Sequence, residues 1–588
     1  MQLTVSYLDE ILVLLIFTVS LNLVMGYAGV FNAAAGAFGA IGGYSLVWLT
    51  ASHGMAFIPA MLIGVAVTAV FGLLVGYAAL RLQALWLLLL TLAVQLVLIG
   101  TLSGLTSLGG SSGLQANNLN IFGYQLVEPT QVLPVVAVGA VLVFLLCYRI
   151  GESPYGRVLR GIRDDETATR SLGKNTFSYK LIVFTLTAAM AGFGGALLSA
   201  DTTTASPSLF GFDVSIQVIA MVIIGGTANM FGSVIGVALV VLSTPFFENV
   251  IHLSTNTASL AQGLAYGLAL VVVVFFRPQG IIPEGIVPWR WRRAAPVPAV
   301  AEGDPGPRPA SAPVPAPLVT VRSPRPSATG AAGDGGGSVL EVRGLSKSFG
   351  GNKAVNDLSF DLHRGKITAL IGPNGAGKTT VFNLITGAIP ADAGQVRLFG
   401  QDITGQRPDV ITGLGMARSF QDVRVFPSLT VLENIMLGIQ DQPGDEMRNL
   451  FARPREVARA ERAARSRARE WLRFIDMEPL AGVRAGSLGF GQQKLVALAR
   501  ILATDSEVLL LDEPGSGIDH AWIDQMVAVV KQVSEAGRTV CIVEHNLEVV
   551  GRLADHVCFM ELGRLTAEGS CTDLTSDPRL TEAYFGTV

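Results

Sequence analysis

A glycine-rich segment in the middle of the chain has the residue types and spacing of a phosphate-binding loop. Gly372 to Thr379 reads GPNGAGKT, follows the apolar run TALI and precedes a helix start. The glycines let backbone N–H groups turn toward phosphate oxygens, and the helix adds its positive N-terminal end. Lys378 would reach the β- and γ-phosphates, and Thr379 would hold Mg²⁺. The nucleotide-binding residues predicted here are Gly372, Asn374, Gly375, Gly377, Lys378, Thr379 and Thr380.

Two further apolar runs end in residues that could hydrolyse a bound nucleotide. EVLLLDEP has the pattern of a buried strand and ends in Asp512, predicted to bind Mg²⁺, and Glu513, predicted to polarise the attacking water. TVCIVEH ends at His545, which we expect to sense the γ-phosphate, although a single histidine can also be purely structural. These runs predict that an α/β domain positions the site.

Composition divides the chain into three parts, which we predict to be residues 1–287, 288–337 and 338–588. Charged residues make up only 15% of the chain, against about 25% in an average soluble protein. The apolar runs lie in the first part, and the last part reads as α/β. The middle part is rich in Pro, Ala and Gly, which predicts a flexible linker. We therefore expect a polytopic helical membrane domain joined to an α/β ATPase domain.

About 20 apolar residues are needed to cross a bilayer as a helix. This length predicts eight or nine spans in the first part, of which the second and seventh are the least regular. The candidates are residues 9–26, 30–50, 58–80, 83–102, 130–148, 180–201, 214–227, 231–247 and 260–276. Polar residues within them, such as Asn22, Gln95 and Gln217, could line a pathway or bond neighbouring helices.

Basic residues predict the orientation. They crowd the loop from Arg149 to Lys180 and follow the last span, whereas residues 103–129 and 249–259 carry no Lys or Arg. By the positive-inside rule the basic segments are cytoplasmic, so the ATPase domain should lie on the cytoplasmic side. The expected location is the cytoplasmic (inner) membrane. The net charge of −3 gives no reason to expect a nucleic-acid partner. The four cysteines are too few and scattered for a disulfide framework or metal site.

Six motifs in the last part resemble those of ABC-type ATPases. They are the phosphate loop, RSFQ ending at Gln421, LGFGQQ at 488–493, LLLDEP at 509–514, SGID ending at Asp519 and EH at 544–545. The resemblance implies ATP and Mg²⁺ as cofactors, Glu513, His545 and Gln421 as catalytic residues, and Thr379, Gln421 and Asp512 around Mg²⁺. It also implies that Phe349 stacks on adenine, Gln421 couples the nucleotide to the permease and Asp519 belongs to the D-loop; packing is the alternative for Phe349.

The signature motif departs from the common Leu-Ser-Gly-Gly-Gln. This chain has Leu488, Gly489, Phe490, Gly491 and Gln492, so it lacks the serine hydroxyl that bonds the γ-phosphate of the partner subunit's ATP. Branched-chain amino acid importers often also lack this serine. We therefore expect Leu488, Gly489, Gly491 and Gln492 to form a working signature, at the slower of two unequal ATP sites.

The first part resembles the permease of branched-chain amino acid ABC importers. The similar segments are SLNLVMGYAG at 20–29, LRLQALWLLLLTLA at 80–93, SPYGRVLRGIRDDETATRSLG at 153–173 and FFRPQGI at 275–281. The loop at 153–173 would dock on an ATPase domain, with Arg163, Asp164, Asp165 and Glu166 as coupling residues. Anchoring of this loop to lipid headgroups is the alternative, against which its acids argue.

The resemblance implies a permease fused to its ATPase, which imports a small solute at the expense of ATP. Branched-chain or other hydrophobic amino acids are the expected cargo; urea, short amides and aromatic acids are alternatives, because residues 30–35 lack polar positions of related permeases. Expected partners are membrane lipid, an external solute-binding protein, and a second permease and ATPase in a heteromer, with a homodimer as alternative. An exporter or a non-hydrolysing regulatory subunit fits the motifs less well.

Overall fold

The protein consists of two compact units. The computed structural model describes residues 2–116, 120–121, 124–125, 129–252, 254–285 and 337–571. One unit contains Met1–Arg163 and Thr176–Ala295, and the other contains Asp164–Asn175 and Pro296–Val588. All but the last residue of the predicted linker 288–337 lies outside the described residues.

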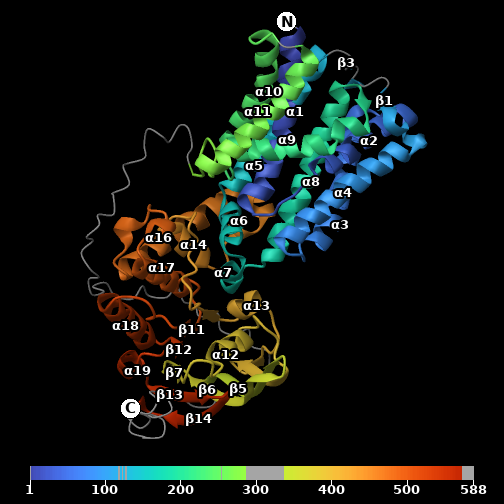
Figure 1. Cartoon of the computed structure of the whole chain (residues 1–588). Helices are drawn as coiled ribbons and strands as arrows, with labels where there is room; N and C mark the ends of the chain where they lie inside the picture. The colour runs from blue at the N-terminus through green and yellow to red at the C-terminus, as the bar shows by residue number, and fades with distance from the viewer. Residues whose placement is uncertain are drawn as a thin grey trace. The chain divides into compact units, whose positions relative to one another are not determined.

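The first unit is helical (Figure 1), and a helix overlaps every predicted span. Its longer helices are α1 (Gln2–Asn22), α2 (Ala35–His53), α3 (Phe57–Ala79), α4 (Ala84–Gly104), α5 (Pro129–Gly151), α6 (Pro154–Asp164, which crosses the unit boundary), α8 (Thr176–Asp201), α9 (Phe212–Gly225), α10 (Met230–Asn249) and α11 (Thr255–Phe276). A π-helical turn, Leu23–Tyr27, continues α1. Strands β1 (Leu114–Gln115) and β4 (Thr204–Ala205) pair antiparallel, as do β2 (Asn120–Ile121) and β3 (Tyr124–Gln125).

Seven helices in the described part of the chain are long and apolar enough to cross a membrane. Two of the nine predicted spans are not among them. The apolar stretch of α11, Leu260–Phe276, is shorter than the others, and α2 is rich in glycine and alanine. The predicted helical membrane domain is confirmed, with about seven apolar helices where the sequence predicted eight or nine spans, and α2 needs a separate explanation.

The composition of α2 follows from its close packing against α8 and α3. A Cβ atom on Gly42 would collide with the backbone of Gly192, and one on Gly43 would lie 2.9 Å from the carbonyl oxygen of Gly195, both on α8. Small residues allow helices in a membrane to approach closely where no hydrophobic force drives them together. The low hydropathy of α2 therefore comes from the small residues that allow it to be buried against other helices.

Two of the polar residues predicted within the spans bond other helices or loops. The Asn22 amide donates to the carbonyl of Asn229, at 3.0 Å, and to the Ser233 hydroxyl, at 2.7 Å. The Gln95 carbonyl oxygen accepts from the Ala37 N–H at 2.6 Å, in the first turn of α2. Backbone groups at membrane depth need protein partners, and Gln95 supplies one where α2 begins.

The second unit contains two sheets (Figure 1). The mainly parallel sheet has the order β10-β11-β12-β7-β13-β14, and the antiparallel sheet has the order β6-β5-β8-β9. Their strands are β5 (Ser338–Phe349), β6 (Asn352–His363), β7 (Ile367–Ile371), β8 (Ala393–Leu398), β9 (Gln401–Asp402), β10 (Met416–Arg418), β11 (Val508–Asp512), β12 (Thr539–Val543), β13 (His556–Glu561) and β14 (Arg564–Gly569). The helices are α7 (Glu166–Ser171), α12 (Lys378–Ile385), α13 (Pro408–Gly413), α14 (Val431–Gly438), α15 (Met447–Ala452), α16 (Pro454–Phe474), α17 (Phe490–Leu502), α18 (His520–Glu535) and α19 (Leu547–Leu553).

Successive side chains of β11 point alternately into the two hydrophobic cores of this unit. Leu509 and Leu511 pack with α17, α18 and α19, whereas Val508 and Leu510 pack with α12 and the antiparallel sheet. Both faces of the strand are buried, which explains its continuous apolar sequence. Because β10, β11, β12 and β7 are parallel, their carboxyl ends meet at one edge of the sheet. Ligands bind at this edge in open α/β folds.

Candidate functional site

The phosphate loop connects β7 to α12. Gly372, Gly375 and Gly377 have φ values of +148°, +84° and +99°, which residues with a Cβ rarely adopt. Gly377 is the N-cap of α12, so the loop leads directly into a helix N-terminus. The Lys378 ammonium lies over the same loop and donates to the carbonyls of Gly372, at 2.7 Å, and Pro373, at 2.9 Å.

Two acidic residues at the end of β11, which is separated from β7 by β12, affect Lys378 electrostatically. Burial lowers the pKa of Lys378, and the negative charges of Glu513 and Asp512 oppose that shift. Thr379, next along α12, is exposed. The phosphate loop and the end of β11 are therefore close enough for their charges to interact.

Asp512 fits a role as metal ligand. It is 1% exposed, and burial raises its pKa while Arg418 opposes this. Its Oδ2 accepts from Arg418 Nη2 at 3.0 Å, whereas its buried Oδ1 has no hydrogen-bond partner among the described residues. A buried carboxylate oxygen without a donor is the kind of atom that a cation satisfies.

Glu513 is at the centre of a short hydrogen-bond network. Its Oε2 accepts from the Gln421 amide at 2.9 Å, and its Oε1 lies 2.7 Å from His545 Nε2. The Glu513 backbone has φ +47°, a conformation that non-glycine residues adopt at a cost of about 1–3 kcal/mol. The structure therefore brings together the three residues predicted to be catalytic, from the ends of β11 and β12 and the segment after β10.

Two residues to which the sequence analysis gave no role hold this turn in place. The buried Lys494 ammonium, on α17, donates to the carbonyls of Glu513, at 3.0 Å, Pro514, at 3.3 Å, and Ser516, at 2.5 Å. Glu544 accepts from the Gly515 N–H at 2.7 Å and from the His545 N–H at 3.2 Å. Both residues stand beside recognised motifs in the sequence: Lys494 directly follows LGFGQQ, and Glu544 directly precedes His545.

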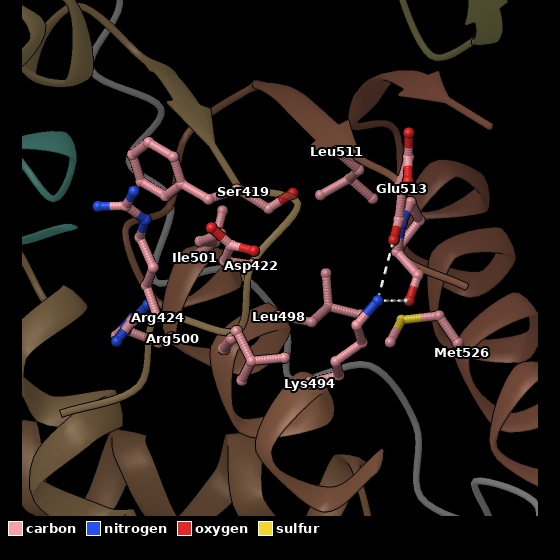
Figure 2. Close-up of a pocket in the computed structure, with 14 residues that line it drawn as sticks. Ser419, Asp422, Arg424, Lys494, Leu498, Arg500, Ile501, Leu511, Glu513 and Met526 are labelled. Atoms are coloured by element: carbon pink, nitrogen blue, oxygen red, sulfur yellow. Dashed lines mark hydrogen bonds between the residues drawn. The ribbon is translucent and has the colours of Figure 1, made fainter. Parts of the chain in front are cut away.

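A pocket separates this turn from the segment after β10. Figure 2 shows Ser419, Asp422 and Arg424 on one side and Lys494 with the Glu513 main chain on the other. Leu498 and Ile501 of α17 line it as well. The segment that carries Gln421 therefore borders open space next to the site.

Two predicted residues lie at element ends. Phe349 ends β5 and is 50% exposed, with the Lys347 ammonium 5.7 Å from its ring centroid. Asp519 is the N-cap residue of α18, and its carbonyl accepts from the Trp522 N–H at 3.0 Å. Adenine stacking by Phe349 and the D-loop role of Asp519 stay predictions.

Comparisons with known proteins match both units. A family described as the permease component of branched-chain amino acid transport systems matches residues 3–275, and the ABC transporter family matches residues 355–516. One relative is BraF of Pseudomonas aeruginosa, a high-affinity branched-chain amino acid transport ATP-binding protein. The two sequences are 35% identical over 250 residues, which cover 42% of this chain and 98% of BraF. This chain belongs to the ABC transporter family. It fuses a permease domain to an ABC ATPase domain, which couples ATP hydrolysis to transport.

Other relatives share the ATPase domain. LivG of Escherichia coli K12, named for the same transport, is 33% identical over 251 residues, 42% of this chain and 98% of that protein. Among solved structures, a nucleotide-free ATP-binding cassette from an ABC transporter is 32% identical in sequence, with a TM-score of 0.37. The match covers 42% of this chain and 100% of that chain.

The signature of this ABC protein forms the start of α17. Gly489 is the N-cap residue, and its N–H donates to the Gln492 side chain at 3.2 Å. A Cβ on Gly491 would lie 2.7 Å from the indole ring of Trp522, whereas one on Gly489 would meet only a Gln492 oxygen at 3.9 Å. The two signature glycines thus have different structural requirements.

The predicted coupling residues divide between the two units. Arg163 stays in the permease unit, where it donates to the Gly26 carbonyl at 2.7 Å and to Glu284 at 2.8 Å. Asp164 and Asp165 belong to the ATPase unit. Glu166 pairs with Arg170 on α7 at 3.0 Å.

Residues 164–175, hereafter the coupling segment, bond several ATPase residues. Asp164 accepts from the Ser428 hydroxyl at 2.6 Å, and Arg424 lies 3.1 Å from Asp165. The Lys174 ammonium, almost fully buried, lies 2.6 Å from Asp445. Further bonds join the Thr412 hydroxyl to the Ser171 carbonyl, at 2.9 Å, and the Gln440 amide to the Leu172 carbonyl, at 2.6 Å.

Proposed function

We propose that this protein imports branched-chain or other hydrophobic amino acids across the cytoplasmic membrane. One observation carries the proposal: a permease family described for branched-chain amino acid transport and ATPase relatives named for the same transport match two parts of one chain. The basic segments around the permease helices support a cytoplasmic location of the ATPase domain.

In the proposed reaction, ATP phosphates lie on the N–H groups of the loop Gly372–Thr379, and Lys378 moves from the loop carbonyls to the β- and γ-phosphates. Asp512 and the Thr379 hydroxyl would hold Mg²⁺, with Gln421 beside them. When bound, Mg²⁺ neutralises developing charge on the phosphates. Phe349 would stack on the adenine.

Glu513 would then polarise the water that attacks the γ-phosphate. Gln421 and His545 both bond this carboxylate, which supports roles for them in orienting it. His545 Nε2, which lies against Glu513, would contact the γ-phosphate in this reaction. A positioned carboxylate of this kind contributes about 10²- to 10⁴-fold to a rate.

We further propose that the coupling segment transmits nucleotide-driven motion to the permease. It is covalently joined to permease helices at both ends, and Asp164, Asp165 and Lys174 bond ATPase residues. The segment from Gln421 to Arg424 touches both Glu513 and Asp165, which supports this route.

The working complex would contain a second permease, a second ATPase and an external solute-binding protein. ABC ATPase domains act as head-to-tail pairs, so Leu488, Gly489, Gly491 and Gln492 would face ATP bound to the partner. A heteromer is our proposal, and the mass of the purified complex distinguishes it from a homodimer.

Uptake of labelled leucine, isoleucine and valine in native cells tests the substrate. We expect Glu513→Gln to abolish uptake at equal expression, and Glu535→Gln, which changes an exposed acid on α18, to leave it intact. Uptake unaffected by Glu513→Gln would reject these substrates, and urea, short amides and aromatic acids would be screened next. ATPase activity surviving Glu513→Gln would reject the catalytic assignment.

A further inference from the structure

Arg418, the last residue of β10, has no assigned role in the proposed site. Its guanidinium is 4% exposed and donates in two directions. Nη2 bonds Asp512 Oδ2 at 3.0 Å, and Nη1 bonds Asn383 Oδ1 at 2.5 Å and, more weakly, the Thr386 hydroxyl at 3.4 Å. Asn383 lies on α12 and Thr386 caps its C-terminal end, so Arg418 connects the helix that follows the phosphate loop to the metal carboxylate.

We propose that Arg418 is a positioning residue that presents Asp512 Oδ1 to Mg²⁺. This inference rests on the proposed metal role of Asp512. The inference extends the proposed metal site to β10, a strand that contributes no proposed metal ligand. It predicts that metal affinity depends on a guanidinium that does not touch the metal.

The contacts around Asp512 support a fixed orientation of the carboxylate. Arg418 engages Oδ2, and the Asp512 N–H donates to the Ser419 hydroxyl at 2.8 Å, while Oδ1 is buried with no hydrogen-bond donor among the described residues. A metal can therefore approach one oxygen while the other is held. Residues that orient a ligating carboxylate commonly change metal affinity by about 10- to 100-fold when they are replaced.

The shape of the guanidinium matters as much as its charge. Bonds to Asn383 and Asp512 leave from different nitrogens of one planar group, a geometry that a lysine ammonium cannot reproduce. The Arg418 charge by itself would repel Mg²⁺, whereas its orientation of Asp512 would favour Mg²⁺ binding. If orientation dominates, replacing Arg418 weakens metal binding; if repulsion dominates, replacing it tightens metal binding.

Arg424 offers a matched control. Both arginines lie near the ring of Phe420: the distance from the guanidinium carbon to the ring centroid is 5.3 Å for Arg418 and 4.7 Å for Arg424. Arg424 pairs with Asp165, and no described contact joins it to Asp512. Replacing it removes the same charge from the same neighbourhood without releasing the metal carboxylate.

The test measures Mn²⁺ binding to the full chain in lipid nanodiscs at saturating ATP. Glu513→Gln forms the background so that ATP persists, and electron paramagnetic resonance reports free Mn²⁺. The variants are Arg418→Gln, Arg418→Lys, Arg424→Gln and Asp512→Asn. The affinity for a fluorescent ATP analogue in EDTA reports whether the phosphate loop remains intact.

We expect Arg418→Gln to raise the Mn²⁺ Kd by about 10- to 100-fold, with a smaller rise in Arg418→Lys and no rise in Arg424→Gln, which removes a repelling charge only. Metal-free nucleotide affinity should be the same in all of them. Unchanged or tighter Mn²⁺ binding in Arg418→Gln, an equal loss in Arg424→Gln, or a loss of metal-free nucleotide binding would overturn the positioning role. Unchanged Mn²⁺ binding in Asp512→Asn would instead overturn the metal site itself, and the inference with it.

Discussion

The two signature glycines differ in the space around them, which predicts different tolerance to a methyl group. In Gly491→Ala the new Cβ would lie 2.7 Å from Trp522, so α17 or α18 must shift. Overpacking of this kind costs about 1–3 kcal/mol. We expect a lower thermal unfolding midpoint and slower ATP hydrolysis. Gly489→Ala is the matched comparison and should lower both less, because its Cβ would meet only a Gln492 oxygen at 3.9 Å; a larger loss in Gly489→Ala would contradict the packing argument.

Lys494 shows how a residue outside the six motifs can support the catalytic turn. Lys494→Met would leave the carbonyls of Glu513, Pro514 and Ser516 without their shared donor. Unsatisfied buried groups cost about 1–3 kcal/mol, so we expect a lower free energy of unfolding and slower ATP hydrolysis. Lys531→Met changes an exposed lysine on α18 and controls for loss of charge. Equal effects of the two changes would remove Lys494 from this role.

At the scale of elements, the coupling segment depends on an ion pair between a buried lysine and a partly exposed aspartate. Lys174→Met leaves the Asp445 carboxylate, which is 20% exposed, without its ammonium partner at 2.6 Å, and we expect a loss of stability below the about 3–5 kcal/mol of a fully buried pair. We expect amino-acid uptake to fall while ATP hydrolysis continues, because the catalytic residues are untouched. Arg448→Met breaks an exposed pair with Glu446, 2.7 Å long, and should leave uptake unchanged. Loss of ATP hydrolysis together with uptake would indicate damage beyond coupling.

The strands of the ATPase site could be predicted because each has both faces buried and ends in a residue with recognisable chemistry. The apolar runs before Gly372, Asp512 and His545 became β7, β11 and β12. The contacts of Arg418 could not be predicted, because Asp512 is 94 residues away along the chain and meets it only through the parallel pairing of β10 with β11. Similarly, α2 gave a weak hydropathy signal because it packs closely against α8 instead of facing lipid.

At the scale of the whole molecule, each ATP site would be shared between two ATPase domains. The phosphate loop and Glu513 of this chain would serve one site, and its signature would serve the other. Gly489 supplies no hydroxyl for a γ-phosphate, and a hydrogen bond to a charged group is worth about 1.5–3 kcal/mol. In a heteromer whose other ATPase carries the signature serine, the site built on this chain's own phosphate loop should therefore be the faster one.

Replacing each catalytic base separately in the assembled complex tests this inequality. We expect Glu513→Gln to remove most of the ATP hydrolysis and the corresponding change in the partner to remove less, because 1.5–3 kcal/mol corresponds to about 10- to 100-fold in rate. Gly489→Ser should raise the rate of the slower site, since a Ser hydroxyl at the α17 N-cap can bond the partner's ATP. Equal losses from the two base changes, in a complex whose mass shows two different ATPase chains, would mean that the missing hydroxyl does not set the rate.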